Sequence, residues 1–518
     1  MHPEVTFVAL LAIATAVAVL ARRVRLPYTV ALVVTGLALG TTRFVHAPHL
    51  TKELLFAAFL PGLLFEAAFN LEFKKFWQNR RAIFGLAIPG VIASIALTGF
   101  FLRSEVAGLH LLPGFSLSIA LVFGAMIAAT DPIAVVAMFK SLGVPKRLAI
   151  LVEGESLLND GTGVVLFTLI LGAVTGGAFS ASQGLLDFIR VAGMGVAIGT
   201  LFGYSASKLT ARIEDPLVEI TITTIAAYGS FVVAEQFHFS GVIATVVAGM
   251  WCGNVGATQG MSPSTRLAVH SFWEYVAFAL NSVVFLLIGF QIRVDALLAA
   301  WKIIVLAWVA VTVARAIVVY VTVAMLRRTT ESMPWSWAAV LTWGGLRGGL
   351  SMVLALALPA NMPFRELLIT TTYGVVILSI LVQGLTMGPL LARLGVSEKT
   401  ARGDGEARAR LLAAKAAIEA LGALSQQGAL HNESANKIKA SLDEELAAAE
   451  AALKAALDAQ QDLGHRELLD AQRQLLHARK DALVRAVRSG AITDDDAHTL
   501  NEELDARLLR VEDGDSEL

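Results

Sequence analysis

The sequence has little charge and almost no cysteine. Only 16% of its 518 residues are Asp, Glu, Lys or Arg, while 56% are hydrophobic. Because soluble domains usually carry about 25% charged residues, this composition argues against an ordinary soluble protein. The single cysteine, Cys252, excludes an intrachain disulfide and gives no sign of an oxidising compartment. The histidines show no spacing typical of a metal site, so we expect no resident cofactor.

The sequence contains many long apolar runs. The mean hydropathy is +0.67, and apolar runs of roughly 18 to 25 residues recur from Val5 to Leu391. The first run is followed by Arg22 and Arg23 and has no basic residue before it, so we expect a retained span and not a cleaved signal. The pattern predicts an all-α polytopic membrane protein with about 13 transmembrane helices, near residues 4–22, 28–42, 53–71, 82–103, 115–139, 147–174, 188–208, 217–236, 239–254, 270–291, 301–326, 335–358 and 366–392.

Basic residues alternate between the predicted loops. Loops after even-numbered spans hold few of them, whereas loops after odd-numbered spans are rich in them, for example Arg22, Arg23, Arg25, Lys74, Lys75, Arg80, Arg81, Lys146, Arg147, Arg327 and Arg328. Since Lys and Arg accumulate in short cytoplasmic loops, we expect a cell (inner) membrane protein with its N-terminus outside and its C-terminus in the cytoplasm.

The composition changes near the end of the last predicted span. We assign residues 1–395 to a transmembrane domain and residues 396–518 to a cytoplasmic helical domain, because Ala, Leu, Glu, Lys and Arg with helical spacing dominate from about Lys399. Thr493 is a predicted N-cap for a further helix. A solvated appendage and a regulatory or dimer-stabilising module, binding a ligand or the membrane domain, both remain open. We expect the lipid bilayer as a partner and no nucleic acid.

The predicted sixth span carries polar residues at bilayer depth. It reads "VEGESLLNDGTGVVLF", Val152 to Phe167. Ser156 and Asp160 are four residues apart and share a helix face, while Glu155 and Asn159 form a second pair rotated by about 100°. Ionisable groups inside a membrane usually mark an ion or substrate path.

The predicted fifth span contains Thr130 and Asp131 directly before Pro132. Proline removes an amide donor and disfavours helix in the preceding residue, so we expect the helix to open and free carbonyl oxygens. Hard cations such as Na⁺ prefer these oxygens together with hydroxyls and carboxylates. The predicted site for the transported cation is therefore Asp160, Asp131, Thr130 and Ser156. The alternative is a Pro-kinked helix with a structurally bonded Asp131.

The predicted twelfth span contains "GGLRGG", with Arg347 among four glycines. Such a segment invites unwinding. Two interrupted spans, fifth and twelfth, fit two inverted six-helix repeats joined by one extra helix. Arg347 keeps its charge and needs a carboxylate partner when buried, for which Glu155 is the candidate. That pairing leaves Asp160 free to exchange partners.

Other polar residues lie within predicted spans. Glu66 could contribute to the cation path or make an interhelical hydrogen bond. We expect the remaining residues of this kind to serve helix packing or gating and not to bind the ion: Glu219, Glu235, Glu274, Asn281 and Arg315.

Five segments carry a resemblance to a known family: "LPGLLFEAAFN", "ATDPIAVVAMFKSLGVPKRL", "EGESLLNDGTGVVLF", "FWEYVAFALNSVVFLLIGFQI" and "WGGLRGGLSMVLALALP". Together they resemble the electroneutral sodium/proton antiporters of the cation:proton antiporter superfamily, the bacterial NhaP-type relatives of animal sodium/hydrogen exchangers. The resemblance spans about residues 5–392.

The resemblance implies a homodimer, with a dimerisation part and a six-helix core that holds two crossed, broken helices. It implies that Asp160 binds either the cation or protons, that Asp131, Thr130 and Ser156 help hold the ion, with Glu66 as an addition, and that Glu155 and Arg347 form a structural ion pair. Asn159 stands where the electrogenic branch has a second aspartate, which implies one-for-one exchange.

The resulting prediction is a secondary transporter, not an enzyme, that exchanges Na⁺ for H⁺ by alternating access, with both ions competing for Asp160. The elevator-like movement comes from the resemblance alone. K⁺/H⁺ or Li⁺/H⁺ antiport remains open. A cation channel would need a continuous wet pore, and a proton-coupled organic-solute carrier would need a larger cavity.

Overall fold

The computed structural model describes residues 3–24, 28–42, 55–109, 112–176, 181–213, 215–291, 293–396, 401–426 and 432–458, with a few single positions after residue 474. The regular elements within these ranges are all helices, and the ranges contain no strand. The chain forms two compact units, Met1–Glu398 and Lys399–Leu518. Each is described by itself.

The first unit contains the apolar helices. Its elements are α1 (Pro3–Val24), α2 (Tyr28–Thr42), η1 (Leu55–Phe59), α4 (Leu60–Asn70), α5 (Phe73–Gln78), α6 (Arg80–Gly85), η2 (Leu86–Gly90), α7 (Val91–Gly108), α8 (Leu117–Met126), α9 (Ile133–Leu142), α10 (Lys146–Gly176), α11 (Ala181–Thr210), α12 (Pro216–Gln236), α13 (Gly241–Trp251), η3 (Cys252–Gly260), α14 (Pro263–Phe290), α15 (Val294–Ala299), α16 (Trp301–Leu326), α17 (Trp335–Trp343), α18 (Gly349–Leu356), α19 (Arg365–Leu378), η4 (Ser379–Gln383) and α20 (Gly384–Arg393), where η marks a π-helical stretch.

Seven helical stretches among the described residues are long and apolar enough to cross a membrane: Arg80–Val106, Lys146–Gly176, Ser182–Thr210, Pro216–Gln236, Thr265–Phe290, Trp301–Leu326 and Arg365–Arg393. Several shorter apolar helices, including Tyr28–Gly40 and Leu117–Met126, accompany them. The all-helical membrane class is therefore confirmed. The exact span count and the inverted repeats stay predictions.

Some helix boundaries differ from the predicted ones. The short helices α5 and α15 lie where loops were expected, and α14 begins at Pro263 instead of 270. The earlier start has a local cause, because Ser262 Oγ accepts the N–H of Thr265 at 3.3 Å and proline fits the first helical turn.

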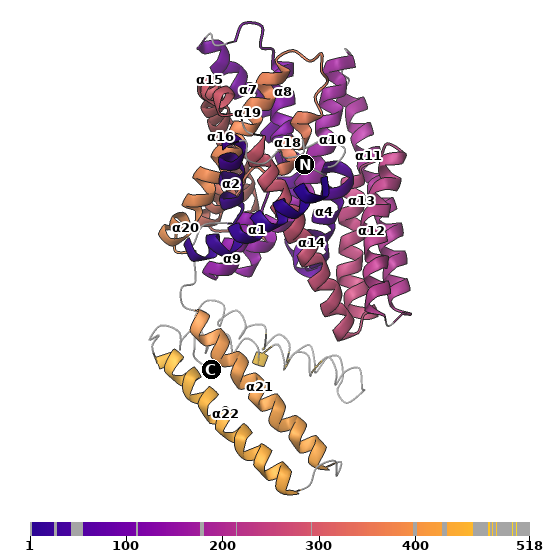
Figure 1. Ribbon diagram of the computed structural model, residues 1–518, viewed down its shortest axis with the longest axis vertical. Coiled ribbons are helices and arrows are strands. Elements are labelled where there is room, and N and C mark those ends of the chain that lie inside the picture. The colour runs from indigo at the N-terminus through magenta and orange to yellow at the C-terminus, as the bar shows by residue number, and fades with distance from the viewer. Residues whose placement is uncertain are drawn as a thin grey trace. The chain divides into compact units, whose positions relative to one another are not determined.

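Small residues let helices in the first unit approach closely. Helices α2 and α14 pack together, and a Cβ atom on Gly36 would collide with the carbonyl oxygen of Leu286. Helices α11, α12 and α13 stand side by side and contact one another (Figure 1). A Cβ atom on Gly199 of α11 would likewise collide with the Ala244 carbonyl on α13. Such backbone-to-backbone approach is typical of membrane helices.

The second unit contains two long helices, α21 (Ala401–Gln426) and α22 (Asn432–Asp458), which pack against each other. Both lie in the range predicted to be helical. The predicted N-cap at Thr493 lies outside the described residues.

Candidate functional site

The predicted fifth span is interrupted at its middle. Helix α8 ends at Met126 and α9 begins at Ile133, with Thr130, Asp131 and Pro132 in the non-helical segment between them. Asp131 Oδ1 accepts the backbone N–H of Ile133 at 3.0 Å. The side chain thereby supplies an acceptor for the start of α9, which explains why the helix resumes there.

The predicted twelfth span is interrupted in the same way. Helix α17 ends at Trp343 and α18 begins at Gly349, so residues 344–348 leave the helical path. The two interruptions meet, because the N–H of Asp131 donates to the carbonyl of Leu346 at 2.7 Å. The structure therefore brings together the two broken helices that the Pro and Gly patterns predicted.

Arg347 fills the gap left by the first interruption. Its Nη1 donates to the carbonyl oxygens of Ile127, Ala128 at 2.7 Å and Ala129 at 3.3 Å, and its side chain is buried. These carbonyls follow the last turn of α8 and have lost their helical N–H partners. A cation at this negative end of a helix is favourable. The predicted pairing of Arg347 with Glu155 is therefore wrong: the guanidinium is held by backbone carbonyls instead of a carboxylate.

Glu155 pairs with Arg315 of α16 instead. Arg315 Nη1 donates to Oε1 at 3.1 Å and Nη2 donates to Oε2 at 2.9 Å, a two-pronged geometry that favours an Arg–carboxylate pair. Arg315 Nε also donates to the Leu341 carbonyl at 3.1 Å. The Arg315 and Glu155 side chains are 11% and 2% exposed, so the pair is largely removed from solvent.

Sequence reasoning assigned Arg315 to packing or gating and so missed this contact. The signal was present, because Arg315 is a fixed charge within the apolar stretch Trp301–Leu326 and needs a partner there for the same reason as Arg347. Sequence spacing gave no means of choosing between the two arginines.

A hydrogen-bonded network links α10 to the interrupted segment. Asn159 Nδ2 donates to Thr130 Oγ1 at 2.7 Å and to Glu155 Oε1 at 2.8 Å, while Asn159 Oδ1 accepts the N–H of Thr130 at 3.2 Å. The hydroxyls of Thr130 and Ser156 lie 2.9 Å apart. These four side chains are buried. The network fixes Thr130 and Ser156 beside the two aspartates that follow Thr130 and Asn159 in the sequence.

Asp131 and Asp160 are the acids that this network leaves available. Both are half-buried, and their charges act on each other. Asp131 Oδ1 is used by Ile133, whereas the Asp160 carboxyl group makes no side-chain hydrogen bond or ion pair within the described ranges. Asp160 can therefore take a proton or a cation without breaking a bond to another side chain.

Glu66 has a partner of its own. Its Oε1 accepts the Asn70 amide at 2.6 Å, one turn further along α4. This contact matches neither alternative predicted for Glu66, because it lies within one helix. A role for Glu66 in the cation path stays a prediction.

The oxygen groups present suit a hard monovalent cation. The Asp131 and Asp160 carboxylates and the Thr130 and Ser156 hydroxyls are ligands of the kind that Na⁺ prefers. Within the described ranges no group of three or more His, Cys, Asp or Glu side chains could hold a metal ion. The side chains brought together here, Asp131, Asp160, Thr130 and Ser156, offer oxygen atoms.

Two interrupted membrane helices that meet beside carboxylates are the arrangement typical of a secondary transporter. The family model described as "Sodium/hydrogen exchanger, transmembrane" matches residues 7–393. The chain belongs to the sodium/hydrogen exchanger family, and the resemblance predicted from its motifs is confirmed. It is a multi-pass membrane transporter and not an enzyme.

Several known proteins are similar to this chain. The Na(+)/H(+) antiporter ApNhaP of Aphanothece halophytica is 41% identical over 398 residues, which cover 76% of this chain and 74% of that protein. The Na(+)/H(+) antiporter NhaS2 of Synechocystis is 32% identical over 513 residues, covering 97% and 93%. The structure of the sodium proton antiporter MjNhaP1 from Methanocaldococcus jannaschii matches with a TM-score of 0.63 and 20% identity, covering 77% of this chain and 100% of that one, and supports the fold.

Proposed function

We propose that this protein exchanges Na⁺ for H⁺ across the cell membrane and that both ions compete for Asp160. The observation that carries the proposal is the contrast between two acids on α10. Glu155 is neutralised by Arg315 through two hydrogen bonds, whereas Asp160 makes no side-chain hydrogen bond or ion pair among the described residues. The similar proteins named as Na(+)/H(+) antiporters support the choice of ions.

Competition follows from the chemistry of one carboxylate. A proton on Asp160 removes the charge that would hold Na⁺, and a bound Na⁺ disfavours protonation. Asp131, Thr130 and Ser156 would complete the oxygen shell for the cation, and their positions are fixed by contacts to Ile133 and Asn159. In each half of the transport cycle the site then carries either Na⁺ or H⁺, but not both.

The charges in the site support one-for-one exchange. Glu155 and Arg315 cancel each other, and Asn159 contributes an amide whose oxygen and nitrogen are both bonded. Asp160 is then the one exchangeable charge on this turn of α10. One proton or one Na⁺ neutralises it equally, so movement of the loaded site carries the same net charge in both directions.

The remaining features of the proposal rest on the resemblance and on the sequence pattern. They comprise 13 spans with two inverted repeats, a homodimer, elevator-like alternating access, an N-terminus outside and a cytoplasmic C-terminus. A regulatory role of the helical tail belongs to the same group. Domain limits of 1–395 and 396–518, Pro132 as the residue that opens the fifth span, and Glu66 as an accessory ligand are proposed with them.

Transport by purified protein in liposomes tests the function. Wild type should move protons when Na⁺ is added to a pH gradient, and Asp160→Asn should abolish the signal because a neutral amide carries neither ion. Asp295→Asn, which changes an exposed Asp on α15, should retain full transport. Li⁺ and K⁺ added in turn report ion choice, and a voltage clamp reports charge balance. Undiminished exchange by Asp160→Asn contradicts the proposal.

A further inference from the structure

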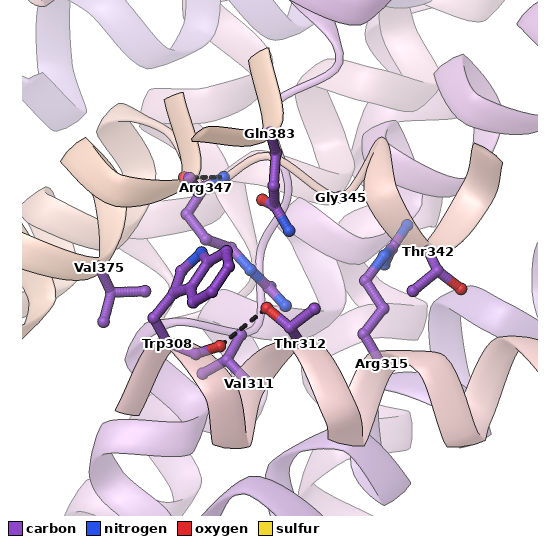
Figure 2. Close-up of a pocket in the computed structure, with 10 residues that line it drawn as sticks. Trp308, Val311, Thr312, Arg315, Thr342, Gly345, Arg347, Val375 and Gln383 are labelled. Atoms are coloured by element: carbon purple, nitrogen blue, oxygen red, sulfur yellow. Dashed lines mark hydrogen bonds between the residues drawn. The ribbon is translucent and has the colours of Figure 1, made fainter. Parts of the chain in front are cut away.

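A small cavity of about 10 Å³ lies in the membrane unit between α16, α17, the unwound residues 344–348 and the α19–η4 region (Figure 2). Its polar wall includes the side chains of Trp308, Thr312, Arg315, Thr342, Arg347 and Gln383. Two of these residues are cationic and none of the residues that line the cavity is acidic. The carboxylates of Asp131, Glu155 and Asp160 do not line it, so the cavity is separate from the proposed cation site.

Arg347 presents unused donors to this cavity. Within the described ranges, every hydrogen bond from its side chain starts at Nη1 and ends on a backbone carbonyl. Its Nε and Nη2 groups are therefore left with donor capacity, although the side chain is only 4% exposed. Figure 2 shows the guanidinium reaching into the cavity between Trp308 and Thr312. A buried charge with free donors calls for an acceptor.

Two further side chains in the wall of the cavity also lack a hydrogen-bond partner. Trp308 Nε1 and Thr342 Oγ1 are buried and have no hydrogen-bond partner among the described residues. The amide of Gln383 extends into the space between Arg347 and Gly345 (Figure 2). Buried donors are normally bonded, so the wall is arranged around a group that accepts hydrogen bonds.

We propose that this cavity binds a small monovalent anion of the halide class. A single water molecule would accept hydrogen bonds but would bring two donors of its own and no charge. An anion accepts from several donors at once. It also compensates the charge of Arg347, because the one carboxylate that acts on Arg347, Glu155, is already paired with the second cation of the wall, Arg315. A cavity of about 10 Å³ has room for one such ion in the place of a single water molecule, without further waters around it.

Halide binding can be measured without transport. Purified protein in detergent is titrated with NaCl or NaBr against sodium gluconate at constant Na⁺ concentration, and the apparent melting temperature is followed. We expect a saturable stabilisation by both halides. X-ray diffraction from crystals grown in bromide should show the ion in the cavity, with its anomalous signal next to Arg347 and Trp308.

A pair of matched variants assigns the effect to the cavity. Trp308→Phe removes the free indole N–H and keeps an aromatic ring, so halide affinity should fall about tenfold. Trp343→Phe is the control, because the Trp343 indole stacks edge-on against Trp308 but donates to Thr386 Oγ1 at 2.8 Å. It should leave halide affinity unchanged.

The possible results either support halide binding in the cavity or overturn it. If Trp308→Phe yields too little protein, Thr342→Val replaces it and should weaken halide binding in the same direction. Stabilisation that is equal in chloride, bromide and gluconate, or bromide density absent from the cavity, overturns the proposal. Because Na⁺ is constant and no transport is read, failure here leaves the proposed antiport intact.

Discussion

Gly348 lies directly against Asp131 where the two interrupted helices meet. A methyl group at Gly348 would lie 2.5 Å from Asp131 Oδ2 and 2.9 Å from its Cγ. The carboxylate is meanwhile held from its other side, since Oδ1 accepts from Ile133 and the Asp131 N–H donates to Leu346. Asp131 therefore has a fixed position. The side chain can occupy that position only because residue 348 is a glycine.

Gly348→Ala should weaken apparent Na⁺ affinity about tenfold, because overpacking costs about 1–3 kcal/mol and the strain falls on the Asp131 carboxylate. The measurement is the Na⁺ dependence of exchange in liposomes. Gly172→Ala is the control, since a methyl group there meets nothing within 4 Å and lies on α10 with Asp160. An unchanged Na⁺ dependence in Gly348→Ala would show that Asp131 does not hold the ion.

Arg315→Ala should lower the free energy of unfolding by about 3–5 kcal/mol, because it leaves Glu155 charged and buried without its partner. The readouts are membrane yield and the apparent melting temperature of the purified protein. Arg315→Gln combined with Glu155→Gln should recover part of the loss, since no charge then remains unpaired.

Arg293→Ala provides the contrast. It breaks an Arg–Asp pair of similar length, 2.9 Å to Asp295, but both side chains are more than two-thirds exposed. Exposed ion pairs contribute little to stability, so yield and melting temperature should stay at wild-type values. Equal losses in Arg293→Ala and Arg315→Ala would show that burial is not the cause.

The two helix interruptions could be predicted from sequence because their causes are local. Pro132 stands at one interruption, and glycines flank Arg347 at the other, as the sequence patterns required. The partner of Glu155 could not be predicted, because it depends on which helix packs against α10. Both arginines satisfied the same rule, that a buried charge needs compensation, yet carbonyls freed by the first interruption compensate Arg347 and leave Glu155 to Arg315.

Glu331 shows the same limit of sequence reasoning. It precedes α17 in sequence but is buried against the start of α6, where its carboxylate accepts the N–H groups of Arg81 at 3.3 Å and Ala82 at 2.9 Å. The residue before α6, Asn79, provides no side-chain cap to that helix. A carboxylate distant in sequence thus performs the task that a local residue usually performs.

Glu331→Gln should destabilise the protein by about 1.5–3 kcal/mol, because one charge-assisted acceptor serving two backbone donors becomes a neutral amide. The apparent melting temperature checks this expectation. Glu72→Gln is the control, since the Glu72 side chain is 61% exposed and pairs with Lys75 on the surface. A melting temperature equal to that of wild type would place the stabilisation of α6 elsewhere.

Competition at Asp160 makes the Na⁺ response depend on pH in a defined direction. Where Asp160 is mostly ionised, the apparent KM for Na⁺ should be independent of pH. Where it is mostly protonated, each unit of falling pH should raise the KM about tenfold, because tenfold more protons must be displaced. Saturating Na⁺ should overcome the effect. Initial exchange rates measured against Na⁺ at stepped pH, with equal pH on both sides before Na⁺ addition, give this slope.

Glu66→Gln tests whether Asp160, and not a nearby acid, causes the pH dependence of the KM for Na⁺. Glu66 is proposed only as an accessory ligand, and its carboxylate accepts from Asn70 on α4. Its replacement should therefore raise the KM for Na⁺ at every pH and leave the tenfold slope intact. Glu155 is held by Arg315 and cannot supply the slope while that pair persists. If falling pH instead lowers the maximal rate at every Na⁺ concentration with a constant KM, protons act at a group other than the one that binds Na⁺. The single-carboxylate mechanism then fails, because its two ions must exclude each other.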